Sequence, residues 1–163
     1  MPSYLVAFAV GEMDSAEITE LSVPGRIYTP KGQAHRTKFA VAQTPKILSA
    51  LEDYFATPYP YEKLDFIAVP NFTHGAMENA GLVTFRSSLL LLDDAPRLTE
   101  QSSPIKTITH ELAHMWYGNL VTMTWWDDLW LNEAFASWME GKITMALYPE
   151  LNTQAQLVQE GAF

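Results

Sequence analysis

The stretch THELAHMWYG, Thr109–Gly118, holds two histidines four residues apart with a glutamate directly after the first. In an α-helix, residues four apart project from one face one turn apart, so His110 and His114 can bind the same ion. Glu111 points elsewhere on that turn, where its carboxylate can take a proton from a water beside the ion. An HExxH pentad alone also fits an ordinary amphipathic helix, so a third ligand must decide.

The third ligand is expected on a second helix. Catalytic zinc usually has three protein ligands, and without any cysteine they must be His, Asp or Glu. Glu133 follows His114 by 19 positions, which is enough for the first helix to end and for a second to return antiparallel beside it. Asp127 and Asp128 compete, but they lie at the expected start of the second helix, where carboxylates commonly cap.

Other side chains of the second helix are expected to support the site. Ligating imidazoles usually donate their second N–H to a polar group, and Asn132 and Glu140 are candidates for that role, with simple solvation as the alternative. Glu140 is seven residues past Glu133 and shares its face of the helix. Large apolar residues are expected to pack the two helices together as core, namely Trp125, Trp126, Leu129, Trp130, Leu131 and Trp138.

The order of predicted elements favours an α+β fold, a mixed sheet followed by helices, in one partial domain that is β-rich over 1–98 and helical and metal-binding over 99–163. The patterns predict strands at 4–10, 17–23, 26–29, 65–70, 82–85 and 88–92. They predict helices at 33–55, from Pro104 with Ser102 or Ser103 as cap to Gly118, at 129–147, and in the tail at 150–163.

Composition excludes several classes of function. A hydrophobic content of 48% supports a buried core, and 10 basic against 19 acidic residues give a net charge of -9, which repels nucleic acid and anionic membranes. Apolar runs such as Leu89–Leu92 are far shorter than the roughly 20 residues of a membrane helix. The absence of cysteine fits both reducing and oxidising compartments, so localisation stays open.

Three motifs together resemble a known family. HELAH at 110–114, NE at 132–133 and GAMEN at 75–79 are similar to the zinc aminopeptidases of the aminopeptidase N type, within the gluzincin group. The resemblance also covers YLVAFAVG, YPYEKLD, VPNF and the segment from WYGNLVT to LNEAFASW. It implies the N-terminal part of a thermolysin-like catalytic domain. It further implies one zinc ion per chain bound by His110, His114 and Glu133, with Glu111 as general base.

The resemblance also gives a role to the segment THGAMENAG, which physical reasoning alone interprets as a glycine-bearing turn or an edge strand. It implies that Glu78 binds the free α-amino group of a peptide. Gly75 and Ala76 would offer main-chain groups, Met77 would line the first side-chain pocket, and Asn79 would fix the loop. A carboxylate that pairs with a buried ammonium selects a chain terminus over internal peptide bonds.

The chain departs from the family pattern at several points. Ala80 stands where an aromatic residue is usual and Ala134 where glycine is common, so the pocket shape is expected to differ. The catalytic tyrosine of the family is expected beyond Phe163, and its second amine-binding acid in a preceding β domain. The chain is therefore expected to be part of a longer parent enzyme.

The resulting hypothesis is a zinc-dependent aminopeptidase that removes N-terminal residues from peptides, the chain alone being weakly active or inactive. Its expected partners are peptides with a free N-terminus and the remaining domains of the parent, and an uncovered apolar face is expected to cause self-association. The alternative is a zinc-holding but inactive peptide-binding domain. Among enzymes, an endopeptidase is disfavoured by GAMEN, and an epoxide hydrolase relative usually has a different motif there.

Overall fold

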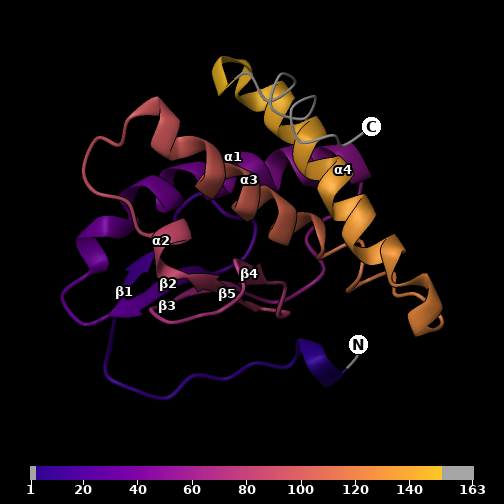
Figure 1. Cartoon of the computed structure of the whole chain (residues 1–163), viewed down its shortest axis with the longest axis horizontal. Helices are drawn as coiled ribbons and strands as arrows, with labels where there is room; N and C mark the ends of the chain where they lie inside the picture. The colour runs from indigo at the N-terminus through magenta and orange to yellow at the C-terminus, as the bar shows by residue number, and fades with distance from the viewer. Residues whose placement is uncertain (1–2, 152–163) are drawn as a thin grey trace.

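The fold is a five-stranded mixed sheet with helices packed above it (Figure 1). The computed structural model describes residues 3–151. The strand order is β1-β2-β3-β5-β4, in which β2, β3 and β5 are parallel and β1 and β4 are antiparallel edge strands. The strands are β1 (Met13–Glu17), β2 (Gly25–Pro30), β3 (Leu64–Val69), β4 (Ala76–Met77) and β5 (Leu82–Arg86).

Four α-helices and four short 3-10 turns complete the described chain. The helices are α1 (Lys38–Phe55), α2 (Ser87–Leu90), α3 (Leu98–Ala113) and α4 (Trp130–Leu147). The turns are η1 (Ser3–Leu5), η2 (Ala34–Thr37), η3 (Trp126–Asp128) and η4 (Pro149–Leu151). Within residues 3–151, every helix is too short or too polar to cross a membrane. The predicted combination of a mixed sheet with helices is confirmed.

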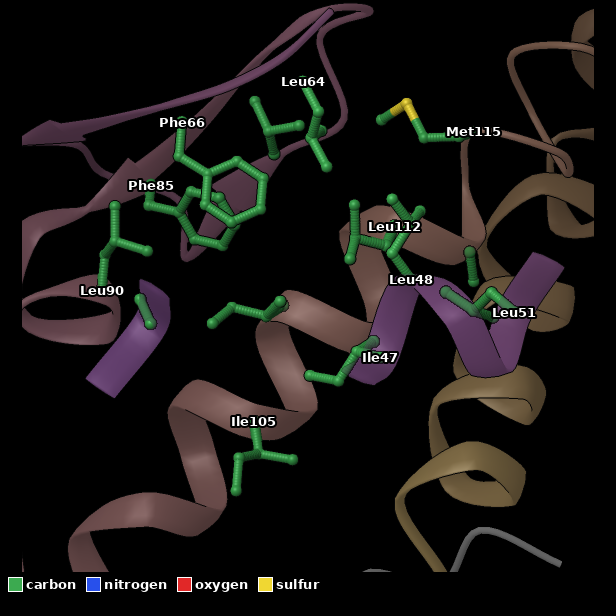
Figure 2. Close-up of a cluster of buried hydrophobic side chains, with 14 of the residues drawn as sticks. Ile47, Leu48, Leu51, Leu64, Phe66, Phe85, Leu90, Ile105, Leu112 and Met115 are labelled. Atoms are coloured by element: carbon green, nitrogen blue, oxygen red, sulfur yellow. The ribbon is translucent and has the colours of Figure 1, made fainter. Parts of the chain in front are cut away.

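The core lies between the sheet and α1 and α3, where side chains from all three meet (Figure 2). The Phe66 and Phe85 rings of adjacent parallel strands have centroids 4.9 Å apart. From α3, fully buried Ile105, Ile108 and Leu112 recur at the three- and four-residue spacing of one helix face. Burying each such side chain contributes about 1.5–3 kcal/mol, so this face fixes α3 on the sheet and thereby fixes the residues at its C-terminal end.

Several strand and helix predictions are confirmed. The patterns at 26–29 and 82–85 fall in β2 and β5, and the pattern at 65–70 overlaps β3. Strand β3 is almost wholly buried, which explains its apolar run Phe66–Val69. The predicted helices at 33–55 and 129–147 correspond to η2 with α1 and to α4. Pro45 lies inside α1.

The strand prediction at 4–10 is wrong. Ser3–Leu5 form a 3-10 turn, and the apolar residues Val6, Phe8 and Val10 are exposed and pair with no strand of the described chain. The strand expected at 17–23 lies earlier, at Met13–Glu17. Its antiparallel pairing with β2 runs from Met13 opposite Pro30 to Glu17 opposite Arg26 and ends there. A run of apolar, strand-favouring residues forms a strand only where a neighbouring strand is available to pair with it.

Two predictions near α3 are also wrong. The apolar run at 88–92 begins inside α2, because a short run of buried leucines looks alike in a strand and in a helix. Helix α3 begins at Leu98, where Arg97 and Glu100 form a capping box, so Pro104 lies inside the helix and the serines before it are not its cap. The helix ends at Ala113 and not at Gly118.

The tryptophans do not form the core between α3 and α4. Trp125, Trp126, Trp130 and Trp138 are each more than half exposed, Leu129 is 41% exposed, and Leu131 is half-buried. The face of α4 that is buried carries smaller side chains, Ala136, Met139 and Ile143. Helix α4 is apolar nearly all round, so its sequence does not show which face packs. The predicted tail helix lies largely outside the described residues.

We expect Leu112→Ala to lower the free energy of unfolding by about 2–5 kcal/mol, because it leaves a cavity where α3 packs on the sheet. The matched control is Leu120→Ala, since Leu120 is 52% exposed and should change the free energy of unfolding by less than about 0.5 kcal/mol. Urea unfolding followed by circular dichroism measures both. Equal losses in the two variants would contradict this description of the core.

Candidate metal centre

The end of α3 and the start of α4 bring three metal-ligating side chains together. His110 lies in the last turn of α3 and His114 is its C-terminal cap residue. Their Nε2 atoms are 3.0 Å apart, and Oε2 of Glu133, from the first turn of α4, lies 3.2 Å from Nε2 of His110 and 3.7 Å from Nε2 of His114. Residues expected on two antiparallel helices from their spacing thus converge within 4.8 Å of one another.

The donor set fits a divalent metal ion such as zinc. The His114 Nδ1 lies 3.1 Å from the carbonyl oxygen of Tyr117, so a proton on Nδ1 satisfies that bond and leaves the Nε2 lone pair free. Nε2 of His110 faces this lone pair at 3.0 Å. Two imidazole nitrogens and a carboxylate oxygen that converge in this way can share a cation, and they are ligands that zinc favours.

Glu140 lies behind the first histidine, where the sequence places a supporting residue. Its Oε2 is 3.2 Å from Nδ1 of His110, on the ring atom opposite the one that faces Glu133. A carboxylate in this position fixes the ring and makes Nε2 a stronger ligand. The second candidate for that role, Asn132, makes no hydrogen bond with either histidine in the described part of the chain. Its Nδ2 donates to Oε1 of Glu78 at 3.2 Å instead.

The charges of the site shift the pKa values of its members. Burial alone would lower the pKa of His110, but hydrogen bonds with Glu133 and Glu140 outweigh it and raise the pKa to about 10. Burial lowers the pKa of His114, and the hydrogen bond with His110 lowers the pKa of Glu133. Burial raises the pKa of Glu111 to about 8.

Glu111 lies outside the group formed by His110, His114 and Glu133, but it converges with Glu78 and His114 in a second group of buried side chains. Its side chain is 5% exposed, and its Oε2 has no hydrogen-bond partner among residues 3–151. It lines a cavity of about 700 Å³ together with His110 and Glu140. A buried carboxylate with an unpartnered oxygen beside an open cavity is a suitable acceptor for a proton from a water or ligand.

The GAMEN segment contributes to the lining of the same cavity. Ala76 and Met77 make up the edge strand β4, and Gly75 and Ala76 line the cavity. Glu78 is buried, and its carboxylate lies within 4.8 Å of ligand atoms of Glu111 and His114. The Asn79 side chain donates to the carbonyl of Leu5 and accepts from the hydroxyl of Thr84, which are contacts that fix the loop.

Two residues that sequence reasoning missed hold Glu78 in place. Asn119 donates from Nδ2 to the carbonyl oxygen of Glu78 at 2.9 Å. Gly118 has a φ of +112°, and a Cβ there would lie 2.0 Å from Oδ1 of Asn132. The glycine therefore allows Asn132 to pack against the backbone and reach Glu78. The only signal in the sequence was the glycine itself, because its partner in the close contact, Asn132, lies 14 residues later on another helix.

Asp127 and Asp128, the competing ligands, lie apart from this cluster. Both are exposed in the turn η3 before α4, and neither belongs to a group of converging ligands within the described part of the chain. Neither caps a helix through its side chain there.

Comparisons with known proteins point to one family. Residues 39–162 match the sequence model of the Peptidase family M1 domain. Aminopeptidase M1-B of Oryza sativa subsp. japonica is 48% identical over 162 residues, and Aminopeptidase M1 of Arabidopsis thaliana is 45% identical over 162, each match covering 98% of this chain. Endoplasmic reticulum aminopeptidase 1 of Homo sapiens is 43% identical over 153 residues, 93% of this chain. The chain spans only 16 to 18% of the length of these relatives.

We expect Gly118→Ala to destabilise the chain by about 1–3 kcal/mol, because alanine is strained at this positive φ and its methyl group would displace the Asn132 amide. Gly11→Ala is the matched control, since a Cβ at Gly11 meets nothing within 4 Å. Thermal unfolding of both variants is the measurement. A melting temperature unchanged in Gly118→Ala would show that this close approach does not constrain the site.

Proposed function

The chain belongs to peptidase family M1, and on that premise we propose that it is the metal-binding part of a zinc-dependent aminopeptidase that removes N-terminal residues from peptides. The observation that carries the proposal is the joint placement of five side chains: His110, His114 and Glu133 converge, with buried Glu111 and Glu78 next to them. Relatives named aminopeptidases support the same activity. Since they are several times longer, we propose that activity requires regions that this chain does not cover.

We further propose that the fold is the N-terminal part of a thermolysin-like catalytic domain. The antiparallel course of α3 and α4 supports this, because their contacts run in opposite order along the chain. Glu140 reaches His110, whereas the earlier Phe135 stacks on the later Tyr117. In this proposal the antiparallel course brings the HExxH helix and the third ligand face to face.

In this proposal His110, His114 and Glu133 bind one zinc ion. When bound, zinc polarises the scissile carbonyl group and lowers the pKa of a water molecule next to it. Glu111 accepts a proton from the attacking water and passes it to the leaving amine. The pKa of Glu111, raised to about 8 by burial, keeps it a base strong enough for this transfer, and a nearby cation shifts the pKa toward neutral pH.

Glu78 binds the α-ammonium group of the peptide. Its carboxylate is held by Asn132, the neighbour of the ligand Glu133, so the amine site and the metal site are fixed to each other. The free edge of β4 lies beside them and can pair with the backbone of an extended peptide. A peptide anchored by its ammonium therefore presents its first peptide bond at the metal site.

Zinc affinity is expected to depend on pH. Among the three ligands only His110 has a raised pKa, about 10, so zinc must displace one proton from it at any lower pH. The apparent association constant should then rise about tenfold per pH unit between roughly pH 7 and 9 and fall as the pH falls. Competition with a chromophoric chelator measures it, with the chelator calibrated at each pH. A constant affinity over that range would contradict the charge state assigned to His110.

Recognition of the peptide amino terminus is expected to depend on Glu78. Glu78→Gln removes the charge partner of the ammonium group, so peptides with a free amine should bind roughly 10- to 100-fold more weakly, while N-acetylated peptides should change little. The measurement is titration of zinc-loaded chain with leucinamide and N-acetyl-leucinamide. Asp127→Asn is the charge-matched control on an exposed carboxylate. An equal loss for both ligands would mean that Glu78 supports the loop and does not bind the amine.

A further inference from the structure

The cavity continues beyond the metal ligands, at the end opposite to Glu78. Strand β4 (Ala76–Met77) is followed by Glu78. The cavity is lined instead by the start of this strand, Ala76, and by the residue before it, Gly75. Past His110 and Glu111 the lining follows the preceding turns of α3, with Thr99, Ser102, Ser103, Lys106 and Thr107. A peptide with its ammonium at Glu78 and its first peptide bond at Glu111 must therefore continue into this part of the cavity.

Lys106 supplies a positive charge in that part. It precedes His110 by four residues, so it lies on the same face of α3, about 6 Å along the helix axis. It is half-buried, and within residues 3–151 its ammonium group makes no hydrogen bond or ion pair. By contrast, Lys31, Lys38 and Lys63 each pair with a carboxylate.

The negative charges around the cavity favour binding of an anionic group only near Lys106. The chain carries a net charge of -9, and Glu111 and Glu140 line the same cavity, so a carboxylate is repelled from most of it. Lys106 is the one lysine or arginine among the lining residues. A ligand carboxylate in this cavity is therefore stabilised only near this ammonium.

We propose that Lys106 forms a subsite for a carboxylate on the residue that follows the scissile peptide bond. The proposal rests on the proposed function for the direction of the peptide. One residue spans about 3.5 Å, so the terminal carboxylate of a dipeptide, or an acidic side chain on the second residue, reaches the flexible lysine. A cavity of about 700 Å³ has room for either. The subsite favours dipeptides and peptides with an acidic second residue.

The test measures binding in a Glu111→Gln background, so that peptides are bound and not cleaved. Zinc-loaded chain is titrated with Leu-Ala, Leu-Ala amide, Leu-Gln amide and Leu-Glu amide by calorimetry or NMR. Leu-Ala should bind about three- to fivefold more tightly than its amide, the size of a partly exposed ion pair. The pair Leu-Glu amide and Leu-Gln amide tests the side-chain source of the same carboxylate.

Variants assign the effect to one residue. Lys106→Met should bring the acid-to-amide ratio to one, Lys106→Arg should keep it, and Lys46→Met, which removes an exposed lysine that does not line the cavity, should leave it unchanged. Circular dichroism melting confirms that each variant is folded. An acid-to-amide affinity ratio of one when Lys106 is present would overturn the proposed subsite. A preference for the acid that persists in Lys106→Met would overturn it as well.

The same titration separates this proposal from the proposed function. Leu-Ala compared with N-acetyl-Leu-Ala reports on the amine site at Glu78, and that ratio should be the same in Lys106→Met. Equal binding of the free and acetylated peptides contradicts the aminopeptidase, whereas equal binding of acid and amide forms contradicts the carboxylate subsite alone.

Discussion

The structure depends on the balance of charge where α3 ends and α4 begins. Four glutamates, Glu78, Glu111, Glu133 and Glu140, surround two histidines, and both Glu78 and Glu111 are almost fully buried. Carboxylates removed from water are costly unless a cation or donors compensate them. The protein's own compensation is a proton on His110 and the Asn132 amide, and among residues 3–151 it leaves one oxygen of Glu111 without a hydrogen-bond partner. A site of this composition is built to bind cations, a metal ion and an ammonium group in our proposal.

The apolar core makes this concentration of charge possible. The buried face of α3 packs on β3 and β5, which fixes the polar end of the helix beside α4. The GAMEN segment is fixed independently through Asn79 and Asn119. Asn132 then joins this segment to α4 beside Glu133. The side-chain amides of Asn119 and Asn132 therefore set the position of Glu78 relative to the converging ligands. The absence of a side chain at Gly118 leaves space for the Asn132 amide.

The convergence of His110, His114 and Glu133 could be predicted from the sequence because it depends on helix periodicity and on one short return of the chain. Helix periodicity alone places His110 and His114 on one face, and the spacing to Glu133 leaves room for one helical return. The same reasoning failed for the tryptophans of α4 and for the segment at 4–10, because apolar residues show that burial is favourable but not which partner provides it. The role of Asn132 was equally hidden, since its contact with Glu78 joins residues 54 positions apart.

The central claim is that His110, His114 and Glu133 bind a single zinc ion. X-ray absorption of the zinc-loaded chain at the zinc edge, with metal content determined on the same sample, tests it most directly. We predict one zinc per chain with two imidazole nitrogens at about 2.0–2.1 Å and otherwise oxygen ligands, and loss of the imidazole signal together with the metal in His110→Ala. Zinc bound without histidine, or retained in full by His110→Ala, would contradict the account.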